Sequence, residues 1–129
     1  MALAVARANA QRLALEVELL EGDLLEPVEG PLDAVLSNPP YVADGDRAAL
    51  APDITRHEPA MALYAGADGL SLIRRLAPQA AAAGATLLAL EVGFGQAGAV
   101  AEIVRAAGFG ETEAVADLAG IERVVVGRR

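Results

Sequence analysis

Two consecutive prolines at positions 39 and 40 constrain the fold more than any other feature of this sequence. Proline has no backbone N–H and disfavours the α region in the residue before it, so neither a helix nor a sheet ladder continues through the pair. The preceding residues 34–37 (AVLS) form a short apolar run that predicts a strand. We therefore expect a stiff loop at the carboxyl end of a strand, where open α/β sheets bind their ligands.

The loop carries Asn38 before the prolines and Tyr41 after them. The Asn38 side-chain oxygen and the Pro39 carbonyl oxygen can each accept a hydrogen bond, so together they can hold both N–H bonds of a planar amino group. Such a grip orients the nitrogen and stabilises the positive charge that develops on it during transfer, and a Tyr41 ring can stack on a flat substrate. The four residues resemble the Asn-Pro-Pro-Tyr motif of methyltransferases that modify amino groups with S-adenosylmethionine. The alternative is a structural turn in which Asn38 caps the strand and Tyr41 packs.

Composition narrows the possible partners. The 129 residues predict one domain, and the net charge of -8, with no lysine, opposes binding to a nucleic-acid phosphate backbone. The absence of cysteine and the single histidine exclude disulfides and thiolate or histidine-cluster metal sites, so no metal is expected. No apolar run approaches the roughly 18 residues of a membrane span, and we expect a cytoplasmic protein with no membrane partner.

The alternation of helical and extended patterns predicts an α/β fold. The expected order is a helix at 2–14, strands at 17–20 and 34–37, a helix at 70–83, a strand at 85–92 buried on both faces, a helix around 100–107, and strands at 111–116 and 122–127. The last two strands are close enough for an antiparallel hairpin. Pro78 predicts a kink or a break in its helix, and the long irregular stretch from the motif to residue 68 is typical of a binding segment.

Further segments extend the likeness beyond the four-residue motif: residues 57–63 (HEPAMAL), 66–70 (GADGL), 90–93 (LEVG) with Gln96, and 117–125 (DLAGIERVV). In this order and spacing the sequence resembles the release-factor glutamine methyltransferases over nearly its whole length. The resemblance implies a class I, Rossmann-like methyltransferase fold with S-adenosylmethionine as cofactor. It also implies methylation of the glutamine side-chain amide in the Gly-Gly-Gln loop of peptide-chain release factors.

The resemblance also implies roles for single residues. Asn38 would touch both cofactor and substrate, and Asn38, Pro39, Pro40 and Tyr41 would line the glutamine pocket, with Asn38, Pro39 and Tyr41 acting on the amide. Asp23 and Leu24 fall where the family contacts the adenine. Leu24 occupies a position often filled by a larger ring, which predicts a weaker apolar contact.

The N-terminal part of the family's sequence pattern is not found in this sequence. Members of the family have a helical domain, a strand that opens into a glycine-rich loop, and a second strand that ends in an acidic residue. We therefore expect residues 1–129 to form a single, N-terminally truncated domain: a partial class I fold without its first two strands, with a C-terminal antiparallel hairpin. The first helix has no N-cap residue, which favours Met1 as an internal start.

This difference has a structural consequence. The family sheet has the strand order 3-2-1-4-5-7-6, so the strands expected at 17–20 and 34–37 lose the neighbours that separate them. An open edge at 34–37 invites wrong pairing. We expect either that these two strands pair directly or that the N-terminal segment is poorly anchored.

Two alternative functions remain. A nucleic-acid methyltransferase acting on adenine-N6 or guanine-N2 can share the Asn-Pro-Pro-Tyr motif, and a non-catalytic binding fragment would need no complete cofactor site. We expect little or no turnover from residues 1–129 alone. Of the other polar residues, Asp117 and Arg123 are predicted to pair across the hairpin and His57 to pack within its loop. Glu91, at the end of a buried strand, either faces the active site or makes a structural hydrogen bond, and the second role is preferred.

Overall fold

The computed structural model describes residues 2–39 and 69–129. The chain divides into two compact units, residues 1–30 and 31–129, and each is described by itself. The expected single domain over all 129 residues stays a prediction.

The first unit begins with α1 (Ala2–Arg12), which confirms the predicted helix but buries none of its residues. Ala14 ends the helical segment in the left-handed region, with φ of 55°. The strand predicted at 17–20 is wrong, because residues 15–21 have no regular structure. A strand requires a hydrogen-bonded neighbour, and no described strand pairs with this segment, so Val17 stays 57% exposed. Residues 17–20 and 34–37 belong to different units, so both the expected direct pairing and its alternative, a poorly anchored N-terminal segment, stay predictions.

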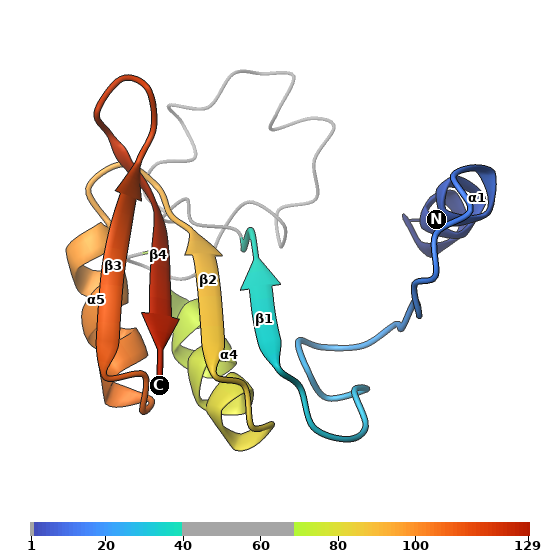
Figure 1. The fold of residues 1–129 in the computed structure, drawn as a ribbon, viewed down its shortest axis with the longest axis horizontal. Coiled ribbons are helices and arrows are strands. Elements are labelled where there is room, and N and C mark those ends of the chain that lie inside the picture. The colour runs from blue at the N-terminus through green and yellow to red at the C-terminus, as the bar shows by residue number, and fades with distance from the viewer. Residues whose placement is uncertain (1, 40–68) are drawn as a thin grey trace. The chain divides into compact units, whose positions relative to one another are not determined.

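The second unit is built on a four-stranded sheet with the order β1-β2-β4-β3 (Figure 1). The strands are β1 (Ala34–Ser37), β2 (Leu87–Glu91), β3 (Glu111–Ala116) and β4 (Glu122–Arg128). β1 and β2 are parallel, whereas β4 is antiparallel to both β2 and β3. This order reproduces the 4-5-7-6 part of the expected class I sheet, and β3 with β4 forms the predicted hairpin. The unit thus has a partial Rossmann-like methyltransferase fold.

Helices α4 (Ser71–Ala82) and α5 (Ala97–Ala106) lie side by side on one face of this sheet (Figure 1). Both helices end where a glycine takes a positive φ, 88° at Gly84 and 117° at Gly108, as their sequence positions predict. Of the kink or break predicted at Pro78, the break is wrong, because α4 continues through the proline, and the kink stays a prediction. The ring faces outward, and the buried stripe of the helix, which includes Ala77 before the proline and Ala80 after it, keeps its packing on both sides.

The core lies between the sheet and these two helices. Its fully buried large side chains are Ile73, Leu88, Leu90, Val92, Val100, Val104, Phe109 and Val125. Along β2, Leu88 and Leu90 are buried but Leu87 and Ala89 are only half-buried, so the predicted burial on both faces is wrong for the described residues. β1 occupies one edge of the described sheet, as expected, and its Leu36 is 74% exposed on the face away from the helices.

Candidate functional site

The parallel strands β1 and β2 end at the same edge of the sheet, and their last residues bring two polar side chains together. Ser37 pairs with Leu90, so Asn38 follows one position beyond the ladder, beside Glu91. Glu91 in turn pairs with Val124 of β4. Because successive side chains alternate between the faces of a sheet, Asn38 and Glu91 share the face opposite to Val35 and Leu90, which pack in the core.

A pocket of about 350 Å³ opens on this face, beside the last residues of β1 and β2. It is lined by Leu36, Ser37, Asn38, Ala89, Glu91 and Val124. The floor is apolar, whereas the amide of Asn38 and the carboxylate of Glu91 stand at the strand ends. Such an arrangement suits a small planar group that bears N–H donors, because apolar atoms support its face and oxygens accept its hydrogen bonds.

The structure describes only some of the loop residues that the sequence predicts to be functional. Asn38 is exposed beside the pocket and Pro39 is buried directly after it, so the proline anchors the loop while the amide stays accessible. Pro40, Tyr41 and His57 lie outside the described residues, and their predicted roles stay predictions.

Asp23 and Leu24 belong to the first unit. Asp23 is exposed, and its carbonyl oxygen accepts a hydrogen bond of 3.1 Å from the N–H of Glu26 in a turn. Leu24 is half-buried with φ of 53°, a left-handed conformation that is uncommon for a leucine. Asn38 belongs to the second unit, so the predicted adenine contacts of Asp23 and Leu24 stay predictions.

Glu91 is the residue to which the sequence gives two alternative roles, a place in the active site or a structural hydrogen bond. Its carboxylate has no hydrogen-bond or ion-pair partner among residues 2–39 and 69–129, and it lines the pocket instead. The structural hydrogen bond predicted for it therefore stays a prediction. The sequence signal for the first role is the position of Glu91 at the end of a buried strand, and the parallel register of β1 and β2 adds that this strand end lies beside Asn38.

The hairpin turn confirms the predicted pair of Asp117 and Arg123, whose Oδ2 and Nε atoms lie 3.2 Å apart. Asp117 Oδ1 also accepts hydrogen bonds from the backbone N–H groups of Ile121, at 3.0 Å, and Ala119, at 2.8 Å. The bond from Ile121 is the largest cause that holds the pKa of Asp117 below its ordinary value of 3.8, and the Arg123 guanidinium acts in the same direction. This carboxylate organises the turn.

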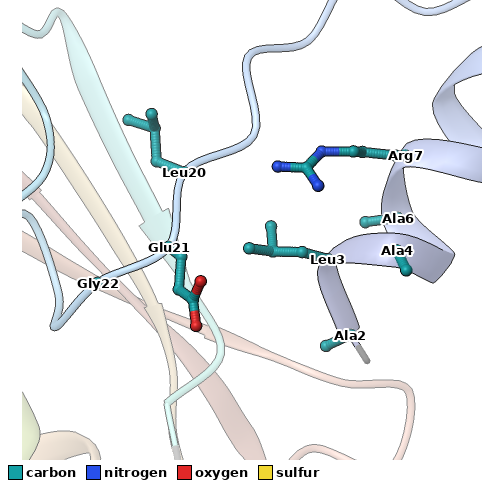
Figure 2. A pocket seen from close by; sticks show the side chains of 8 residues that line it. All are labelled: Ala2, Leu3, Ala4, Ala6, Arg7, Leu20, Glu21 and Gly22. Carbon is teal, nitrogen blue, oxygen red and sulfur yellow. The ribbon is translucent and has the colours of Figure 1, made fainter.

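A second hollow lies within the first unit, between α1 and residues 20–22 (Figure 2). Its volume is about 640 Å³, and the side chains of Leu3 and Arg7 on α1 point toward the segment that carries Leu20 and Glu21. No residue of α1 is buried, and neither Asp23 nor Leu24 lines this space. The hollow is therefore a gap beside an unpacked helix, without a convergent set of polar groups.

None of the helices in the described ranges is both long and apolar enough to cross a membrane.

Comparisons with known proteins give one consistent result. The family model described as the methyltransferase small domain matches residues 1–66. The relative named release factor glutamine methyltransferase in Rhodospirillum rubrum is 45% identical over 132 residues, which cover 99% of this chain and 41% of the relative. Proteins of the same name in Deinococcus radiodurans and Gloeobacter violaceus are 45% and 44% identical, and each match covers 46% of the relative. The chain thus spans less than half the length of these relatives.

Proposed function

Because the chain belongs to the methyltransferase small domain family, we propose that it forms the amide-binding part of an S-adenosylmethionine-dependent methyltransferase. Its substrate is the side-chain amide of the glutamine in the Gly-Gly-Gln loop of a peptide-chain release factor, and it acts in the cytoplasm. The observation that carries the proposal is the pocket at the end of β1 and β2, where Asn38 and Glu91 stand above an apolar floor. The relatives named release factor glutamine methyltransferase support the choice of substrate.

The pocket residues perform three tasks in this proposal. Asn38 Oδ1 and the Pro39 carbonyl oxygen accept the two N–H bonds of the glutamine amide and set the direction of its nitrogen. Leu36, Ala89 and Val124 support the flat amide and keep water from one of its faces. The Glu91 carboxylate favours the positive charge that develops on the nitrogen as a bond to carbon forms.

Residues in each unit, taken separately, carry groups that suit the cofactor chemically. The exposed carboxylate of Asp23 can accept a hydrogen bond from an adenine amino group, and the exposed amide of Asn38 can both donate and accept. Leu24 offers a small apolar contact beside Asp23. When bound, S-adenosylmethionine would supply the methyl group on a positively charged sulfur, and Asn38 and Pro39 would orient the acceptor nitrogen.

A nucleic-acid acceptor suits the chain less well. Association with a phosphate backbone depends largely on neutralisation by Lys and Arg side chains. This chain has a net charge of -8, and its pocket carries a carboxylate.

The proposal is tested by calorimetric titration of the purified chain with a peptide that contains Gly-Gly-Gln and with the same peptide carrying Glu in place of Gln. The glutamine peptide should bind more tightly, because a glutamate has no N–H bonds to donate and is repelled by Glu91. Asn38→Ala should weaken binding of the glutamine peptide by roughly tenfold, as expected when a buried polar contact is lost.

A matched pair of variants controls for charge. Glu91→Gln changes the pocket, whereas Glu111→Gln makes the same change at the other end of the sheet, where β3 begins. Equal affinity for the two peptides, or equal affinity of native chain and Asn38→Ala for the glutamine peptide, would refute the proposed amide grip.

A further inference from the structure

We propose that the two loops beside the pocket, residues 93–98 and 117–122, form a docking surface for the protein that carries the methylated glutamine. This inference rests on the proposed function and extends it from the acceptor amide to the surrounding substrate. The surface would receive a segment with an apolar side chain next to a lysine or arginine. Its central residues are Phe94, Leu118, Ile121 and Glu122.

Phe94 is an exposed aromatic ring on a well-defined turn. The side-chain Oε1 of Gln96 accepts a hydrogen bond of 2.8 Å from the N–H of Gly93, and the N–H of Gln96 donates one of 3.1 Å to the Gly93 carbonyl oxygen. Two bonds thus close the loop around Phe94, whose side chain remains 79% exposed. The bonds fix the backbone that carries the ring, and exposed aromatic side chains on a fixed backbone are typical of residues that dominate protein interfaces.

The hairpin turn lies against the same loop. Phe94, Gly95, Ala97 and Gly98 line a pocket of about 280 Å³ together with Gly120, Ile121 and Glu122. An added Cβ at Gly95, Gly98 or Gly120 would meet no atom within 4 Å, so this hollow has room for a side chain from a partner. Leu118 projects from the turn at 109% exposure, and Asp117 fixes the turn through its backbone hydrogen bonds.

Topology places this surface at the same end of the sheet as Asn38. β2 ends at Glu91 and leads directly into the Phe94 loop, and the antiparallel β4 begins at that end, since Glu91 pairs with Val124. Figure 1 shows the β3–β4 turn and the tips of β1 and β2 at one end of the sheet. Strands lie about 4.8 Å apart, so β4 is about 10 Å from β1, a span of three or four extended residues.

The charge of the surface determines the chemistry of its partner. Glu91 and Glu122 are exposed, and neither carboxylate pairs with a cation in the part of the chain that the structure describes. The nearby guanidinium of Arg123 is already held by Asp117. An acidic rim around an apolar centre complements an apolar side chain flanked by a basic one, and it repels a nucleic-acid backbone.

The test compares a large probe, which can contact both the pocket and the loops, with a small probe, which can contact the pocket alone. An intact bacterial peptide-chain release factor can cover both the pocket and the loops, whereas a single glutamine with capped ends is shorter than the roughly 10 Å between β1 and β4. Affinities of the purified chain for both probes are measured by calorimetry. We expect Phe94→Ala and Gly98→Leu each to weaken release-factor binding at least about tenfold, the size typical of a central interface residue. Binding of the capped glutamine should not change.

Matched controls separate docking from folding. Gly110→Leu adds the same side chain as Gly98→Leu at a glycine that is equally open but precedes β3 at the opposite end of the sheet. Glu122→Gln should weaken release-factor binding most at low salt, whereas Glu111→Gln should have little effect. The thermal midpoint of each variant shows whether the fold is retained.

The outcomes distinguish this proposal from the proposed function. If the release factor binds and Asn38→Ala weakens it, but Phe94→Ala, Gly98→Leu and Glu122→Gln do not, the docking surface is refuted and the amide grip stands. If only the loop variants weaken binding, the docking surface stands and the amide grip is refuted. If the native chain binds the short glutamine probe but not the release factor, the docking surface is refuted and the amide grip stands; if it binds neither, both are refuted.

Discussion

Replacement of Gly127 by alanine should destabilise the second unit more than its small size suggests. Gly127 is buried in β4, where the strand passes beneath α5. A Cβ at this position would overlap Cγ1 of Val104 and lie 2.9 Å from Cβ of Phe109. Both of these side chains are fully buried, so neither can move into solvent to relieve the overlap.

The magnitude follows from two opposing effects. Overpacking of a filled core costs about 1–3 kcal/mol, whereas the lower backbone entropy of alanine in the unfolded chain contributes about 0.4–1 kcal/mol of stability. The net loss is therefore about 1–2 kcal/mol. For a unit of this size, a loss of that order lowers the midpoint of thermal unfolding by roughly 4–16 °C.

Urea denaturation followed by far-UV circular dichroism measures this loss as a lower midpoint with an unchanged slope. Gly110→Ala is the matched control, because an added Cβ there meets no atom within 4 Å, and it should change stability by less than about 0.5 kcal/mol. In a Val104→Ala background the cost of Gly127→Ala should shrink, since the overlapping methyl group is gone. A midpoint for Gly127→Ala equal to or above that of the native chain would refute the close approach of α5 to β4.

Three further predictions concern other parts of the second unit. The folded-state pKa of Asp117 is lowered, so the stabilising effect of its carboxylate is present above the unfolded pKa and is lost as the pH falls through the folded pKa. The urea midpoints of the native chain and of Asp117→Asn should therefore differ at neutral pH and converge in acid below about pH 4. Arg129→Met removes hydrogen bonds of 2.8 Å to the Ala85 carbonyl and 3.0 Å to the Ala81 carbonyl, and should lower the free energy of unfolding by about 1–2 kcal/mol; an unchanged urea midpoint would show that this contact contributes nothing. Leu36→Lys, on the edge strand β1, should leave the thermal midpoint unchanged but reduce self-association in sedimentation experiments at rising concentration. Equal self-association of the native chain and the variant would show that the exposed edge strand does not promote association.

Local sequence signals determined most of the second unit. Residues 34–37 stop at the proline pair, and the glycines at 84 and 108 end their helices, because each signal acts within a few residues of the chain. The helix and strand order, the hairpin and the Asp117–Arg123 pair were predictable for the same reason. Position 38 could be singled out because an Asn before two prolines needs no tertiary contact to be held at a strand end.

Only the tertiary structure decided which residues become neighbours across the sheet. Val17 and its neighbours have the apolar content of a strand but form none, because a strand exists only where another backbone supplies its hydrogen bonds. Glu91 joins Asn38 because the register of β1 on β2 aligns Ser37 with Leu90, a pairing between residues more than fifty positions apart that no local pattern encodes. The position of Phe94 beside the hairpin turn likewise depends on the antiparallel return of β4, so the pocket and the surface next to it are properties of the assembled sheet.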